Sequence, residues 1–114
     1  MKTTWATLSA SGMYNEREGK ATLHDYQVAV DGYIECVDTN PLFSMYVNEE
    51  GLLKGLPRNL IASVLSTAFI VGDVAIVGKA DRFGNTKPLS APALRFLRNM
   101  FNEEHCDKAS EPCE

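Results

Sequence analysis

The sequence predicts an α+β fold: a single small domain with a mixed, mainly antiparallel sheet of about 4–6 strands and two or three flanking helices. Short segments in which polar and apolar residues alternate predict the strands. Segments with apolar residues at helical spacing, each preceded by a capping residue, predict the helices. Because 114 residues leave no room for a second core, we expect one domain.

The charge of the chain is concentrated at its C-terminal end. The net charge is −4, and residues 103–114 carry five acidic residues and one lysine, which also gives −4. We therefore expect an uncharged domain over residues 1–102 and a flexible acidic tail over residues 103–114. A DNA mimic needs carboxylates spread over a rigid surface, so this distribution argues against that class of protein.

The composition also bears on the compartment. No apolar segment approaches the roughly 18 residues of a membrane-spanning helix, and the opening residues "MKTTWATLSASG" lack the apolar stretch of a secretory signal. Three cysteines without disulfide-like spacing agree with a reducing compartment. We expect a cytoplasmic protein in which Cys36, in the apolar segment "YIECV", is a core side chain.

The first part of the domain is predicted to hold two strands, over residues 3–9 and 33–38, with a helix between them. Trp5 is large enough to anchor a core, and the connection that follows admits a short strand around Met13 and Tyr14. The helix is expected to begin after the capping residue Thr22, paired with Asp25, and to end at Gly32, which readily adopts the left-handed conformation. Its apolar stripe consists of Leu23, Tyr26 and Val30.

The segment 40–55, "NPLFSMYVNEEGLLKG", predicts a hairpin. Phe43, Met45 and Val47 point to one face of its first strand, and the other face is also largely apolar, which is typical of an interior strand. The turn is expected at "NEEG", Asn48 to Gly51, with a partner strand after it.

The remainder predicts two helices separated by a second hairpin. Asn59 is a good cap for a helix in which Leu60, Ile61, Val64 and Leu65 share one side. A strand over residues 68–78 is expected to bend at Gly72, and residues 79–90 to return as a short edge strand. Ser90 begins the last helix, whose apolar stripe consists of Leu94, Leu97 and Phe101, widened by Phe96 and Met100.

No set of residues has the pattern of a catalytic or metal site. Glu49 and Glu50 fall at a predicted turn, where solvated carboxylates make poor general acids and bases. His24 has no nucleophile near it in the sequence, and a closed zinc site needs four ligands, whereas the tail offers three: His105, Cys106 and Cys113. The glycines of "IVGDVAIVG" lack the Lys-Ser/Thr of a phosphate loop. We therefore expect no catalytic residue, no metal and no cofactor.

Basic residues near the two predicted hairpins are the candidate binding residues. If the hairpins lie side by side, the basic side chains form one positive patch for a nucleotide, a phosphate or an acidic protein surface. The alternative is that they are scattered, solvated charges. With the neighbouring polar residue Asn59 added, the candidate binding residues are Lys54, Arg58, Asn59, Lys79, Arg82 and Lys87.

Four separated segments resemble the DUF3846 family, whose members are small domains of unknown function found largely on bacteriophages, plasmids and other mobile elements. The segments are "DGYIECV" (31–37), "VNEEGLLKGLPRN" (47–59), "VGDVAIVG" (71–78) and "FGNTKPLS" (83–90), and the similarity covers roughly residues 20–95. The resemblance implies a mobile-element setting and supplies no catalytic residue. Its motif residues are expected to be structural: Asn48, Glu49, Glu50, Gly51, Gly55, Pro57, Gly72 and Gly78.

Two functions are consistent with these features. The first is a non-enzymatic phage or mobile-element protein that binds and modulates a host protein, for example as an inhibitor of host defence. The second is a small-ligand protein that sequesters a nucleotide signal through the basic patch. A host protein is the expected partner, a small anionic ligand or a second copy of the chain is an alternative, and membranes and sequence-specific nucleic acid are not expected.

Overall fold

The computed structural model describes residues 3–80, 83 and 85–109, with side chains to Phe101. Five strands form one antiparallel sheet in the order β2-β1-β5-β4-β3, and three helices accompany it, which confirms the predicted α+β class. The strands are β1 (Thr3–Leu8), β2 (Tyr14–Glu18), β3 (Ile34–Val37), β4 (Ser44–Asn48) and β5 (Val74–Val77). The helices are α1 (Leu23–Val30), α2 (Leu60–Ser66) and α3 (Ala91–Ala109).

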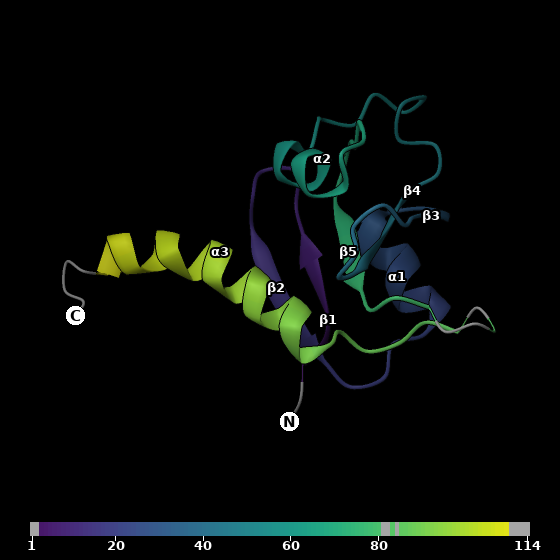
Figure 1. Cartoon of the computed structure of the whole chain (residues 1–114). Helices are drawn as coiled ribbons and strands as arrows, with labels where there is room; N and C mark the ends of the chain where they lie inside the picture. The colour runs from purple at the N-terminus through teal and green to yellow at the C-terminus, as the bar shows by residue number, and fades with distance from the viewer. Residues whose placement is uncertain (1–2, 81–82, 84, 110–114) are drawn as a thin grey trace.

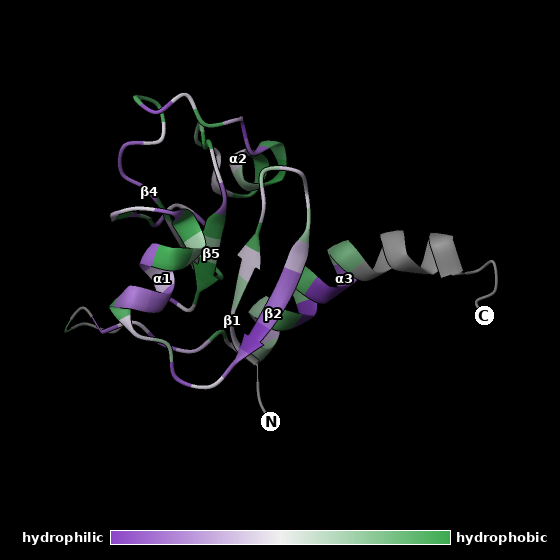
Figure 2. Cartoon of the chain, turned by 180° about the vertical axis from the view of Figure 1, so that it is seen from behind, coloured by the Kyte–Doolittle hydropathy of each residue, from purple (hydrophilic) through white to green (hydrophobic). Residues whose placement is uncertain are grey.

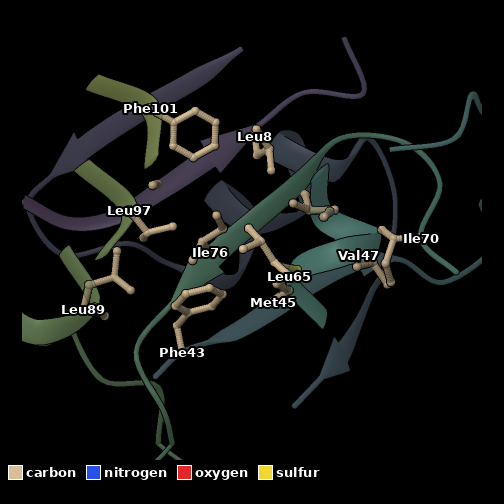
Figure 3. Packing of buried hydrophobic residues seen from close by; sticks show 14 residues of the cluster. Leu8, Phe43, Met45, Val47, Leu65, Ile70, Ile76, Leu89, Leu97 and Phe101 are labelled. Atoms are coloured by element: carbon tan, nitrogen blue, oxygen red, sulfur yellow. The ribbon is translucent and has the colours of Figure 1, made fainter. Parts of the chain in front are cut away.

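The sheet is covered on both faces, with α1 on one face and α3 on the other (Figure 1). One core lies between the sheet and helices α2 and α3, and it includes Leu8, Met45, Ile76 and Leu97 (Figure 3). A smaller core beneath α1 contains Trp5, Tyr26, Ala75 and Val77. All four residues of β5 are buried because this strand is central and both of its faces are covered.

Several local predictions are confirmed. Thr22 and Asp25 form a reciprocal capping box at the start of α1, with the Thr22 backbone N–H donating to Asp25 Oδ2 over 2.8 Å. Strand β2 begins at Tyr14, where the sequence is compatible with a short strand. Strand β4 is an interior strand, as predicted, with Met45 and Val47 in the larger core. The predicted bend at Gly72 occurs, with φ 79° in the left-handed region, but it lies before β5 (Val74–Val77) and not within a strand over residues 68–78.

The first predicted hairpin is wrong, and the second is confirmed only as one antiparallel bridge among the described residues. Strand β4 pairs with β3 on one side and β5 on the other, so no edge is left for a partner strand after Asn48. Residues 49–55 instead form successive turns, which begin where the Glu50 N–H donates to Asn48 Oδ1 over 2.8 Å. Of the second hairpin, the described residues contain an isolated bridge between Gly78 and Lys87.

Three side chains also differ from expectation. Cys36 is exposed rather than buried, because β3 is an edge strand. Leu23, at the first position of α1, is 59% exposed, although Tyr26 and Val30 of the same predicted stripe are buried. The left-handed residue that ends α1 is Asp31, with φ 62°, and not Gly32; aspartate tolerates this conformation better than most residues do.

Asn59 connects three elements through one buried side chain. Its Nδ2 donates to the carbonyl oxygens of Leu8 (3.2 Å) and Gly72 (3.0 Å), and its Oδ1 accepts the Ala62 N–H (3.0 Å). Its backbone N–H donates to the Ile70 carbonyl over 2.9 Å. The end of β1, the approach to β5 and the start of α2 are therefore joined at this residue.

The C-terminal helix is attached to β2 by a polar and aromatic cluster. The Tyr14 ring stacks on Phe101, with 4.3 Å between ring centroids, and its hydroxyl donates to Glu16 Oε2 over 2.9 Å. Arg98 donates to both oxygens of the Glu16 carboxylate at 2.9 Å. Burial, followed by the hydrogen bond to Glu16, raises the pKa of Tyr14 far above its ordinary value.

Replacing Asn59 with alanine is expected to lower the free energy of unfolding by about 2–4 kcal/mol, because a cap is lost and buried polar groups lose their partner. Urea denaturation measures this value. Asn15→Ala, at an exposed position of β2, is the control and is expected to change it by less than about 0.5 kcal/mol. Equal values for the two variants would show that Asn59 does not connect the fold.

The pKa of Tyr14 is higher in the folded chain than in the unfolded chain, so the folded state holds this proton more tightly. The corresponding stability is fully present below about pH 10, the ordinary tyrosine pKa, and is lost as the pH rises above it. The Tyr14→Phe variant is therefore expected to lose stability less steeply than the native chain above about pH 10. Urea denaturation over a pH series measures how steeply the free energy of unfolding falls with pH in the native chain and in the variant. Identical slopes would show that folding does not raise the pKa of Tyr14.

Candidate functional site

The segment "VNEEGLLKGLPRN" lies between two buried asparagines. Asn48 is 5% exposed, and its Nδ2 donates to the carbonyl oxygens of Val30 and Asp31, at 3.0 Å each, at the end of α1. Asn59 is fully buried at the start of α2. These two residues attach the ends of the segment to different helices, and the residues between them form an exposed surface.

Close packing determines which side chains of this segment face outward. A Cβ atom on Gly51 would lie 2.7 Å from Val71 Cγ2, and one on Gly72 would lie 2.8 Å from Leu56 Cδ1, so both glycines leave space that their neighbours fill. Leu56 is half-buried there, whereas Leu52 and Leu53 are 69% and 88% exposed.

Helix α2 buries two serines and exposes two of its large apolar side chains. Ser63 and Ser66 are 6% and 1% exposed, whereas Leu60 and Val64 are 61% and 76% exposed. The buried hydroxyls are satisfied, because Ser63 Oγ donates to the Asn59 carbonyl (2.8 Å) and Ser66 Oγ donates to the Ala62 carbonyl (2.8 Å). Leu60 and Val64 therefore do not share the buried side with Leu65, which corrects the sequence prediction.

Exposed apolar side chains of α2 continue onto the neighbouring loops. Leu52, Leu53 and Phe69 line a groove of about 500 Å³. Phe69 and Val64 line a second groove of about 300 Å³, and Val64 and Leu60 a third of about 260 Å³. Since neighbouring grooves share a residue, the side chains form one surface, which we call the apolar end: Leu52, Leu53, Leu60, Val64 and Phe69. Much of α2 is apolar in Figure 2.

A single basic side chain is integrated into the apolar end. The Arg58 guanidinium carbon lies 4.9 Å from the centroid of the Phe69 ring, a cation–π contact. The backbone of Arg58 is bridged to Val71, which holds the residue next to β5. Arginine and phenylalanine packed in this way are typical of the centres of protein interfaces.

The predicted basic patch is divided between two ends of the molecule. Arg58 is bridged to Val71, before β5, and Lys87 is bridged to Gly78, after it, so the two side chains lie at opposite ends of this strand. Lys54 belongs to the turns near Asn48, on the Arg58 side. The candidate Arg82 falls outside the described residues.

Lys79 has a local structural role. It forms an ion pair with Asp38 and donates to the Asn40 carbonyl over 2.7 Å. The hydrogen bond from Lys79, assisted by one from Ser44, lowers the pKa of the Asp38 carboxyl. This lysine therefore fastens the segment before β4 to the segment after β5.

The described residues considered for catalysis are exposed to solvent. Glu49, Glu50 and His24 are exposed, and Cys113 together with the side chains of His105 and Cys106 falls outside the described part of the chain. Among the described residues, no group of three or more His, Cys, Asp or Glu could hold a metal ion. Within the same residues, no helix is long and apolar enough to cross a bilayer.

These features define a small α+β domain with a five-stranded antiparallel sheet and a largely apolar surface at one end of the sheet. The family described as "Domain of unknown function (DUF3846)" matches residues 8–102, which is most of the chain, and this chain belongs to that family. No curated protein and no solved structure matches it.

The exposure of Leu60 and Val64 was missed because apolar residues at helical spacing are normally buried. A signal was present in the same helix, since Ala62, Ser63 and Ser66 form an alternative side of small residues suited to close packing.

Two adjacent α2 positions test the orientation of this helix. Val64→Ala is expected to change the free energy of unfolding by less than about 0.5 kcal/mol, because the side chain is exposed. Leu65→Ala is expected to cost about 2–4 kcal/mol, because Leu65 belongs to the larger core. Chemical denaturation of both variants measures the difference, and the reverse order would place Val64 in the core.

Proposed function

We propose that this chain is a non-enzymatic protein-binding domain whose docking surface is the apolar end. Its partner is a cytoplasmic protein of the host that carries the mobile element, and binding modulates that protein, as a defence inhibitor does. The observation that carries the proposal is the orientation of α2, which buries Ser63 and Ser66 beside Leu65 and leaves Leu60 and Val64 in solvent.

The proposal is supported by the apolar area that binding of a partner would remove from water. Fully burying a valine, leucine or phenylalanine side chain is worth about 1.5–3 kcal/mol, and five such side chains are largely exposed on one connected surface. Contiguous apolar surface of this kind is typical of interaction sites. The folded chain meanwhile gains nothing from leaving it exposed.

The surface also indicates the chemistry of the partner. Arg58 contacts Phe69 and has no acidic partner among the described residues, so a carboxylate of the partner fits beside the guanidinium. We therefore expect a partner surface with an apolar centre and at least one acidic side chain near its edge. A second copy of the chain is the alternative occupant that the experiment has to separate from a host protein.

Two valines provide a matched pair of variants. Val64 lies within α2 and is 76% exposed, and Val28 lies within α1 and is 65% exposed. Val64→Glu places a charge in the apolar end, and Val28→Glu places the same charge on a helix elsewhere. A host protein that co-purifies with the native chain is expected to be retained by Val28→Glu and lost with Val64→Glu.

The interaction is then measured with both proteins purified, and Val64→Glu is expected to weaken it at least about tenfold, since one central contact is worth more than about 1.4 kcal/mol. Sedimentation of the isolated chain is expected to show a monomer. Equal binding by the two variants would overturn the proposed surface. A native dimer that Val64→Glu converts to monomers would show that a second copy occupies it.

A further inference from the structure

A pocket lies on the opposite face of the sheet from α3, beside α1 and separate from the apolar end. Its volume is about 760 Å³, within the usual range for small-molecule sites. Its walls come from β1, from the connection between β2 and α1, from α1 itself and from the segment 85–88. The pocket exists because α1 has eight residues and covers only part of this face.

Aromatic side chains form the interior of the pocket. Trp5 and Tyr26 meet edge to face with 5.1 Å between ring centroids, and Tyr26 and Tyr46 are tilted by 56° at 4.9 Å. All three rings line the pocket, together with aliphatic side chains such as Leu23 and Ile34. The exposure of Leu23, which the core does not explain, is accounted for by its place in this wall.

The segment 85–88 is held over the sheet at three points. The Tyr46 hydroxyl is hydrogen-bonded to Thr86 Oγ1, the Gly78 N–H donates to the Lys87 carbonyl over 2.9 Å, and the Leu89 N–H donates to the Thr4 carbonyl over 2.9 Å. A Cβ atom on Gly78 would collide with the backbone of this segment, so the close approach requires glycine. The β1–β2 register shifts between Thr3 and Trp5, where the segment attaches, and such bulges are frequent beside binding sites.

The charged side chains among the described lining residues are both basic. Lys20 comes from the connection between β2 and α1, and Lys87 comes from the segment 85–88. Arg17 lies just outside, with its guanidinium carbon 5.4 Å from the Trp5 ring centroid. The pocket thus combines an aromatic interior with a positive rim.

We infer that this pocket binds a mononucleotide, with the base against Trp5, Tyr26 and Tyr46 and the phosphate between Lys20 and Lys87. A nucleobase is a flat π-system that aromatic side chains accept without sequence-specific hydrogen bonds. A phosphate suits lysine side chains as point charges. This site does not rest on the proposed docking surface, because the two share no residue and lie on different parts of the fold.

Trp5 is the single tryptophan of the chain, so its emission reports on the pocket alone. The experiment titrates the full chain with AMP, GMP, CMP and UMP, and follows both the heat of binding and Trp5 emission. The four corresponding nucleosides serve as matched ligands without phosphate, and inorganic phosphate as the matched ligand without a base. At least one nucleotide is expected to bind saturably with a change in Trp5 emission, and its nucleoside to bind about tenfold more weakly or less.

The variants separate this pocket from the other basic residues. The double variant Lys20→Gln/Lys87→Gln is expected to weaken nucleotide binding at least about tenfold, whereas Lys54→Gln, at the other end of β5, leaves it unchanged. The inference is overturned if none of the four nucleotides binds at millimolar concentration, if the double variant binds as the native chain does, or if inorganic phosphate binds as tightly as the nucleotides. Val64→Glu is expected to bind nucleotide normally, so failure of one proposal leaves the other standing.

Discussion

The buried side-chain amide of Asn59 is the interaction on which the arrangement of this domain depends. A primary amide can donate two hydrogen bonds and accept others, and this one donates to β1 and to the Gly72 turn while it accepts from the first turn of α2. An apolar residue of similar size would leave the carbonyl oxygens of Leu8 and Gly72 buried without these partners, at a cost that packing does not recover. Asn48 acts in a similar way at the end of α1, so two asparagines position two helices against one sheet.

The position of Asn59 has a direct effect on the surface. Because the cap is fully buried, the first turn of α2 is held against the sheet, and small side chains fit between helix and sheet beside Leu65. Ser63 and Ser66 occupy that space and return their hydrogen bonds to the helix backbone. The larger residues Leu60 and Val64 are consequently on the outside. The exposed apolar end and the stability of the fold therefore have the same structural origin.

On the other face, the shortness of α1 has a comparable effect. This helix packs on β3, β4 and β5 and contacts Trp5 of β1 through Tyr26, and beside that contact the segment 85–88 and the β2–α1 connection complete a pocket. Trp5 precedes the residues 8–102 that match the family, whereas most other lining residues fall within them.

Local signals were more informative than pairing signals in this sequence. The Thr22–Asp25 capping box, the Asn59 cap and the two-sided burial of β4 followed from side-chain chemistry and periodicity within a few residues. The strand pairing could not be predicted in this way, because "NEEG" is equally suited to a hairpin turn and to the first of several turns. Which of the two forms depends on β5, about thirty residues away. The convergence of Trp5, Tyr26 and Tyr46 likewise depends on strand order, which no single segment contains.

The account is tested most directly by native-state hydrogen exchange of the Ala62 amide. Amides in the first turn of a helix usually exchange rapidly, because they lack a partner within the helix. Here the Ala62 N–H donates to the buried Asn59 Oδ1, so we expect it to exchange only when the whole domain unfolds, with the same opening free energy as the amides of β5. Exchange of Ala62 at the rate of the exposed turns at residues 52–55 would show that α2 opens independently, and that Asn59 does not hold the helix on the sheet.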